Sequence, residues 1–401
     1  MTTRVAAALV CGLVGLLSGG TVGAQEPSAP QAVSAEQLKA AIDKLGDLDY
    51  ATRTNAARLV RRTTPAQAVP ALLQAAAEHA DGYVRYRALV ILTGFNDPRT
   101  RDAMRQSLAS PNDRLRAVAY GYFEREPDAS LLQPFVAALD KEQGEFVRPA
   151  LVRALAALIA VDAAPAVLGA QQGLVRDVSR GEDFFRSSVI EALGDYRARY
   201  AYDAITEVAK AEGPLQDDAA LALGKIHDTR ALETLAGLQR TAPRAAQPSI
   251  AAAICLLDVN CDAHIGFLVE TLKFSDKNAG FQELLRAAAA GLGALGVAGR
   301  QPAVDALLDV GIPAKDDSTR APVALAFATV ALRRTPLALT VLEGYRDREG
   351  AIALLADGFD MLEEDLDKER FFAFVRRAYW DSADGSPRRA LMQTLIARLD
   401  F

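Results

Sequence analysis

The stretch that decides the fold runs Asp218-Ala-Ala-Leu-Ala-Leu-Gly-Lys-Ile-His-Asp-Thr-Arg-Ala-Leu-Glu-Thr-Leu235. It continues an apolar set of four residues, Leu215, Ala219, Leu223 and Ile226. Offsets of four, eight and eleven residues place such side chains on one face of an α-helix. Asp228 then precedes a second apolar segment, where its side chain is suited to cap a helix. The stretch therefore predicts two helices joined by a short turn, with an apolar face that a neighbouring helix pair must cover.

The same spacing recurs along the chain. The four positions are Val84, Ala88, Leu92 and Phe95 in an earlier unit, Phe185, Val189, Leu193 and Tyr196 in another, and Leu284, Ala288, Leu292 and Leu295 in a later one. The second position is often alanine, which lets a partner helix approach closely. Aromatic residues make up only 6% of the 401 residues, and long β-branched runs with period-two alternation are absent. The pattern therefore favours helices over a sheet.

An arginine next to the apolar set gives the period of the repeat. These arginines are Arg53, Arg85, Arg116, Arg148, Arg186, Arg320, Arg348 and Arg388. The first five are 32, 31, 32 and 38 residues apart, and the same register then passes through Gln216, Gln247 and Leu285. Internal repeats of about 20–50 residues indicate a solenoid.

Acidic residues precede most of these arginines by three or four positions, as at Asp49, Asp81 and Asp113. An aspartate there can cap the helix and complement its dipole. One interpretation of the arginines is a charged ladder for an acidic ligand. We favour structural tethers between repeats, because each arginine comes with its own acid.

These features resemble HEAT-like repeats, including the short form associated with phycobilisome lyases. The resemblance covers residues 35–401 and is strongest up to about residue 240. It implies an all-α, right-handed solenoid of about eleven helix pairs, with residues 366–401 as a C-terminal capping unit. It says little about function, since such repeats serve many unrelated roles.

The first 24 residues are typical of a secretory signal peptide. Arg4 supplies the positive charge, residues 5–17 are apolar, and Val22-Gly23-Ala24 forms a cleavage site before Gln25. An uncleaved anchor is the alternative, but the apolar run is shorter than the ~20 residues that span a bilayer. We therefore expect an exported protein, periplasmic or secreted. Residues 25–34 are expected to form a flexible lead-in, with Ser34 and Gln37 as a capping box.

Export bears on Cys255 and Cys261, which lie six residues apart. Two thiols in an oxidising compartment can form a disulfide. The alternative is one buried cysteine and one incidental one. A zinc site using His264 is disfavoured because no fourth ligand has a sensible spacing.

The last unit is rich in aromatic residues, which are expected to close the core at the end of the solenoid. Tyr379 and Trp380 are the candidates for a partner contact, because these residue types favour interfaces.

Charge and motifs argue against two other classes of function. The formal net charge is −6, without a basic block, so we expect no nucleic-acid partner. His79, His227 and His264 fall in different units, away from any plausible nucleophile. We therefore expect no catalytic site, cofactor or metal, and no transmembrane segment in the mature chain.

The predicted function is a non-catalytic scaffold. Stacked helix pairs form a curved rod whose concave side is available to an unidentified protein or peptide, with no enclosed pocket. The alternative is a lyase- or chaperone-like protein acting on a chromophore or a modified protein, which is implied by the resemblance to phycobilisome lyases.

Overall fold

The computed structural model describes residues 29–161, 167–278, 280–362, 365–399 and 401. Within these ranges the chain forms 22 α-helices and four short 3-10 helices, and Gln31 and Thr63 form one isolated bridge. The all-α prediction is confirmed. The predicted signal peptide, residues 1–24, and residues 25–28 of the lead-in lie outside the described residues.

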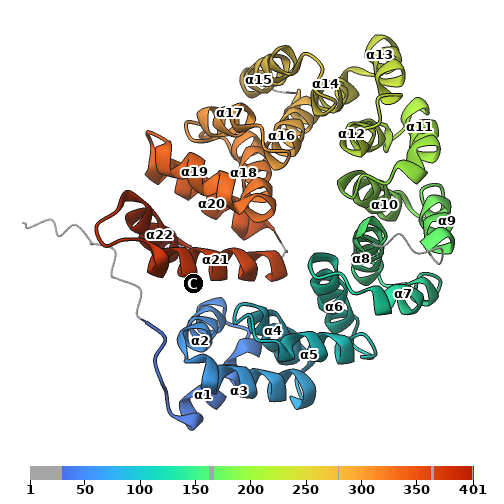
Figure 1. The fold of residues 1–401 in the computed structure, drawn as a ribbon. Helices are drawn as coiled ribbons and strands as arrows, with labels where there is room; N and C mark the ends of the chain where they lie inside the picture. The colour runs from blue at the N-terminus through green and yellow to red at the C-terminus, as the bar shows by residue number, and fades with distance from the viewer. Residues whose placement is uncertain (1–28, 162–166, 279, 363–364, 400) are drawn as a thin grey trace, which may run out of the picture.

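The even-numbered helices carry the register positions and stack on one another as the inner layer of the solenoid (Figure 1). They are α2 (Tyr50–Arg62), α4 (Gly82–Thr93), α6 (Asp113–Arg125), α8 (Val147–Val161), α10 (Asp183–Asp195), α12 (Gln216–Ile226), α14 (Gln247–Leu256), α16 (Gln282–Val297), α18 (Asp317–Arg333) and α20 (Arg348–Met361).

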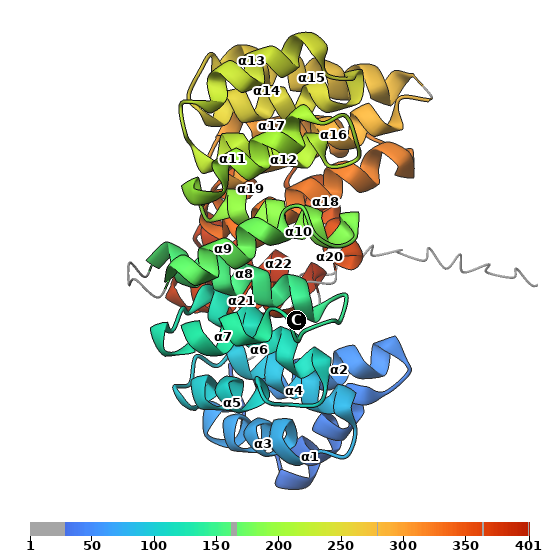
Figure 2. The same cartoon turned by 90° about the vertical axis from the view of Figure 1, so that its right-hand side faces the viewer.

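The odd-numbered helices form the outer layer, which faces the viewer around α9 and α11 in Figure 2. They are α1 (Ala35–Asp43), α3 (Pro65–Glu78), α5 (Arg99–Ser107), α7 (Leu132–Ala138), α9 (Val167–Asp177), α11 (Tyr202–Lys210), α13 (Ala231–Thr241), α15 (Cys261–Lys277), α17 (Gln301–Gly311) and α19 (Thr335–Gly344). The last unit consists of α21 (Asp365–Asp381) and α22 (Pro387–Arg398).

Side-chain caps start many of these helices. Ser34 and Gln37 form the predicted capping box, and the Asp49 and Asp81 carboxylates accept hydrogen bonds from backbone N–H groups at the starts of α2 and α4. At α6 the cap is Asn112, so Asp113 lies in the first turn instead. Acids in the first turn still complement the positive end of the helix dipole.

The part of the lead-in that the structure describes is hydrogen-bonded to the first helices. The Gln31 backbone N–H donates to the Arg62 carbonyl at 2.8 Å, and the Gln31 carbonyl accepts from Thr64 N–H at 3.1 Å. The Gln67 side chain bonds both backbone groups of Val33. These bonds fix residues 31–33 against α2 and α3, so this part of the predicted flexible lead-in is anchored.

The apolar face predicted from the repeat is the core. Leu92, Leu193, Leu223 and Leu292 each have 0% of their surface exposed. They lie between the two layers and between successive units, as expected of a solenoid in which each unit packs against its neighbours.

Glycine and alanine bring successive inner helices into close contact. A Cβ atom at Gly224 of α12 would lie 2.4 Å from the Cα of Ala253 in α14. A Cβ at Gly358 of α20 would lie 2.3 Å from the Ala324 carbonyl oxygen of α18. These two positions therefore require glycine, because any other residue would collide with the neighbouring backbone.

The solenoid closes into a ring, where the sequence predicted a curved rod with a capping unit at its C-terminal end. Helix α21 lies against α4 and α6 of the opening units as well as against α18 (Figure 1). The Arg61 guanidinium of α2 is 2.7 Å from the Glu369 carboxylate of α21. The predicted capping unit, residues 366–401, thus covers the end of the array by packing onto its beginning.

No single described helix has both the length and the apolar character to cross a membrane. Helices α18 and α19 have the required length and apolar character only when taken together, and the chain bends by 119° between them.

Replacing Gly224 tests the close approach of the inner helices. We expect Gly224→Ala to lower the free energy of unfolding by about 1–3 kcal/mol, because the added methyl group must push α14 away. Chemical denaturation measures this. Gly237 in α13 is the matched control, since a Cβ there meets nothing within 4 Å. Gly237→Ala should stabilise by about 0.5–1 kcal/mol, and a similar loss at both sites would contradict the packing described here.

Candidate functional site

Most of the register arginines bond the backbone at the end of the preceding helix or turn. The side chains of Arg85 and Arg186 donate to the Ala76 and Val178 carbonyls at 3.0 and 3.1 Å. The same type of bond is made by Arg53, Arg116, Arg320 and Arg348. Carbonyls at a helix C-terminus lack intrahelical partners and carry partial negative charge. The arginines therefore close each turn within its unit.

Glutamine replaces arginine in this role in the middle of the chain. The Gln216 and Gln247 amides donate to the Ala209 and Ala242 carbonyls, both at 3.0 Å. A shorter side chain thus makes the same bond without the charge, so the bond to the carbonyl is the shared feature of these positions. Leu285 has no group that can make it.

Some of these arginines also bond an acid in the following unit. Arg116 makes a two-pronged contact with Glu142 at 2.7 and 2.8 Å, and Arg320 lies 2.6 Å from Asp357. Arg148 lies 3.4 Å from the buried Asp177 and over the Phe185 ring. Arg388 is 3.7 Å from Glu343 of an earlier unit. These contacts tether neighbouring units.

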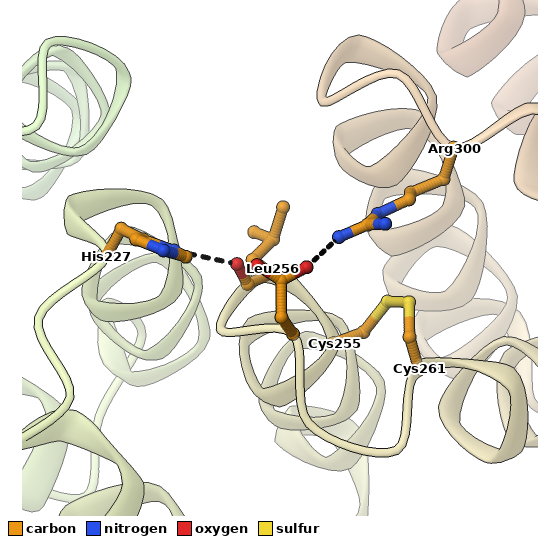
Figure 3. The surroundings of a disulfide bond; sticks show 6 residues. His227, Cys255, Leu256, Cys261 and Arg300 are labelled. Atoms are coloured by element: carbon orange, nitrogen blue, oxygen red, sulfur yellow. Dashed lines mark hydrogen bonds and ion pairs between the residues drawn. A yellow bond between two sulfur atoms is a disulfide. The ribbon is translucent and has the colours of Figure 1, made fainter.

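The structure joins Cys255 and Cys261 in a disulfide across the turn between α14 and α15 (Figure 3). A ring nitrogen of His227 lies 3.0 Å from the Leu256 carbonyl oxygen. On the other side, Arg300 forms an ion pair with Asp258. The turn is therefore held by its covalent link and by polar contacts from both flanking units.

The prediction of Tyr379 and Trp380 as partner contacts needs a correction. Tyr379 is fully buried, with 0% of its surface exposed, and packs edge-on against Trp380. Tyr379 belongs to the core because it faces α22, whereas Trp380 retains 44% exposure and remains available. The two residues are adjacent in α21 and both are aromatic, so residue type alone did not distinguish the buried one from the exposed one.

The three histidines lie apart, as their sequence positions suggested. His79 contacts Asp43 at 3.2 Å, and His227 contacts the Leu256 carbonyl. His264 lies in the first turn of α15, where burial lowers the pKa of its imidazole. In the described part of the chain, none of them lines the cavity that the ring encloses.

That cavity has a volume of about 870 Å³ and lies between the inner helices of the two arcs. One wall comes from α16, α18 and α20. Small and apolar side chains form its centre, where Leu325 and Met361 keep 40% and 42% of their surface exposed, and Arg286 and Asp317 are among its polar residues. The facing wall comes from α6, α8, α10 and α12 and carries charged residues, among them Arg125, Arg153 and Lys225. The site is thus amphipathic.

Most of the charges on the polar wall are bound to one another. The Arg153 side chain donates to Glu124 at 3.0 Å and to Asp195 at 2.9 Å. Lys225 donates to Asp195 at 2.8 Å, and the Tyr196 hydroxyl donates to Glu124 at 2.7 Å. Burial opposes ionisation of Asp195, but Lys225 and Arg153 outweigh it and hold the pKa of this carboxyl below its usual range.

This network crosses the ring. Arg333, at the end of α18, lies 3.6 Å from Glu124 of α6 and 3.9 Å from Asp367 of α21. Asp367 in turn accepts a hydrogen bond from Arg125 of α6 at 2.7 Å. One set of charges therefore connects the beginning, the middle and the end of the chain.

Asp218 and Ser187 form a separate pair on the polar wall. The Ser187 hydroxyl donates to the Asp218 carboxylate at 2.6 Å. Burial raises the pKa of Asp218, and the nearby charges of Asp217 and Glu191 add to the effect while the bond from Ser187 opposes it. This pair offers a hydrogen-bonding group to a bound molecule next to the apolar wall.

Sequence reasoning did not identify the residues of this cavity. One departure from the repeat pattern marks it in retrospect. Eight residues after the register position, the chain has glycine in several units, at Gly194, Gly224 and Gly293, but Glu124 in the unit of Arg116. In those units this position packs against the next helix. A carboxylate there therefore indicates a buried polar partner, which is Arg153.

The family model described as HEAT repeats matches residues 36–122. This stretch consists of HEAT repeats. The units that follow continue its alternation of inner and outer helices to α22. No curated protein matches the sequence.

Several solved structures are similar to this HEAT array. The complex of CpcE and CpcF of phycocyanin lyase from Nostoc sp. PCC7120 is 20% identical, covers 67% of this chain and 97% of its own, and has a TM-score of 0.40. The YibA protein of Escherichia coli is 15% identical over 57% of this chain and 83% of its own, with a TM-score of 0.41. Importin beta is also 15% identical, over 90% of this chain and 55% of its own, with a TM-score of 0.40.

The carbonyl bond of the register positions is tested at Arg85, whose side chain makes this bond to Ala76. We expect Arg85→Ala to lower the free energy of unfolding by about 1 kcal/mol, the value of one hydrogen bond. Arg85→Gln should lose less than half of that, because glutamine makes the same bond at Gln216 and Gln247. Arg346→Ala, at an exposed arginine, is the control in the same urea titration. Equal losses for the two Arg85 variants would rule out the bond as the stabilising contact.

Proposed function

We propose that this chain is a non-catalytic scaffold that binds a protein or peptide inside its ring, and that it works outside the cytoplasm. The observation that carries the proposal is the cavity enclosed by the inner helices. HEAT solenoids present a long concave surface for protein partners. In this chain that surface combines exposed Leu325 and Met361 with polar groups opposite them.

The character of the cavity supports binding over catalysis. Arg153, Asp195 and Lys225 of its polar wall are bound to one another, and alanine, glycine, leucine and methionine side chains form the apolar part of the facing wall. A partner segment gains burial of apolar surface on one side and hydrogen bonds to Asp218 and Ser187 on the other.

Two features of the chain support export. Residues 1–24 have the charge, apolar run and cleavage site of a secretory signal. Cys255 and Cys261 are paired, and such pairs persist in oxidising compartments.

Site-specific photo-crosslinking tests the scaffold. A crosslinking amino acid in place of Leu325, and separately of Met361, should capture the same protein in intact cells. Leu325→Asp should weaken the binding of that purified protein about tenfold or more, because a charge would enter the apolar contact.

Leu168 of α9 is the control position, since it is 61% exposed on the outer layer. Capture of the same protein at Leu168 would place the partner outside the ring and contradict the proposal. Mixing the purified chain with a linear tetrapyrrole should leave the absorption spectrum of the pigment unchanged. A spectral shift that Leu325→Asp abolishes would support the lyase-like alternative instead.

Mass spectrometry tests export and the disulfide together. Protein recovered from the cell envelope or the medium should begin at Gln25, and its non-reduced peptides should contain Cys255 linked to Cys261. An intact Met1 with two free thiols would contradict both parts of the proposal.

A further inference from the structure

Three carboxylates near the start of α21 each meet an arginine of a different opening unit. Glu369 lies 2.7 Å from Arg61 of α2, and Asp365 lies 2.8 Å from Arg87 of α4. The third pair is the bond already described between Asp367 and Arg125 of α6. We call these contacts the seam of the ring. The inner surface of α2, α4 and α6 thus presents one arginine per unit to an acidic helix.

Further contacts fit α21 to this surface. The Tyr86 hydroxyl donates to Asp365 at 2.6 Å. Leu366 packs against the core of the first units, where a Cβ at Gly121 would lie 3.1 Å from its Cδ2 atom. The Arg61 guanidinium lies over the Phe372 ring, 5.3 Å from its centroid. The surface therefore recognises both the charge and the shape of a helix.

The seam differs from the other helix contacts in its chemistry. Successive inner helices meet through fully buried apolar side chains, whereas the seam consists mainly of ion pairs. Salt weakens ion pairs but not buried apolar contacts, and it weakens partly buried pairs such as these less than exposed ones. The seam is therefore the contact of the ring that relies most on charge.

The closed seam also brings like charges together. Arg376 of α21 donates to the Arg61 carbonyl at 2.8 Å, close to the Arg61 and Arg62 side chains. Burial and the charge of Arg62 lower the pKa of Arg376 to about 10. The Glu369 carboxylate opposes this shift, so the like charges near Arg376 are partly balanced.

We propose that the inner surface of α2, α4 and α6 is a binding site for an acidic helix, and that α21 occupies this site in the closed ring and leaves it when the ring opens. A partner that presents an acidic helix then competes with α21. The inference rests on the proposed function in taking the ring interior as the surface that meets a partner.

The test uses a fluorescent peptide of residues 365–381, which is α21 itself, added to the full mature chain. Asp367→Asn combined with Glu369→Gln removes two carboxylates from the seam. We expect this variant to bind the peptide at least tenfold more tightly than the wild type does, because its own α21 no longer fills the site. Its radius of gyration from small-angle X-ray scattering should also increase.

Glu349→Gln combined with Asp360→Asn is the matched control. It changes the net charge equally, at two exposed acids of α20 that lie outside the seam. It should behave as the wild type does. Adding Arg87→Ala and Arg125→Ala to the seam variant should abolish peptide binding.

Two results of these measurements would contradict the proposal. Equal peptide affinity and equal radius in the seam variant and the control would overturn the proposal. A larger radius without peptide binding would overturn the assignment of an acidic helix to this surface. Because the peptide replaces the partner of the scaffold, a failure here leaves the crosslinking at Leu325 unaffected, and the two proposals fail separately.

Hydrogen exchange of the unmodified protein covers the case in which the seam variant does not fold. Raising the salt from about 0.1 M to about 1 M weakens ion pairs, partly buried ones less than exposed ones, and does not weaken the apolar contacts between successive units. Amides of α21 should then exchange faster, while those of α16 and α18 keep their protection. Salt-independent exchange of α21, at the rate of α18, would show a permanent closure and overturn the proposal.

Discussion

The structure depends on one constraint: the apolar face of each helix pair is buried only when the next pair covers it. Leu92 and Leu223 are completely buried between units, and glycine or alanine at the contact lets the inner helices pack closely together. Stability in such an array is close to a sum over neighbours. The shape of the whole molecule follows from the small rotation that each contact imposes on the next unit.

The polar bonds serve that packing. Within a unit, an arginine or a glutamine closes the turn by bonding a carbonyl at the end of the preceding helix, as Arg85 and Gln216 do. Between units, Arg116 and Glu142 fix the angle of approach. The arginines considered as a charged ladder for a ligand are therefore used in structural contacts, and the proposed surface for a partner lies elsewhere, on the concave side.

Local features were predictable from the sequence because they depend on residues close together in the chain. The helix faces, the capping box of Ser34 and Gln37 and the repeat itself are of this kind. The ring and its cavity were not, because they depend on curvature accumulated over all units. The contact of Arg61 with Glu369 joins residues that are 308 positions apart, and no spacing rule reaches so far. The difference in burial between Tyr379 and Trp380 has a similar cause, since the packing of α22 decides which of them is buried.

Closure also limits how this protein can vary. An open array tolerates the gain or loss of one unit, because only the two neighbours notice the change. In a ring, the rotations of all the units must add up to the full turn that brings α21 back to α2. A duplicated or deleted unit would carry the acids of α21 past the arginines that receive them. The number of units is therefore set by the geometry of the circle, and a change in length would have to be matched by a change in curvature elsewhere.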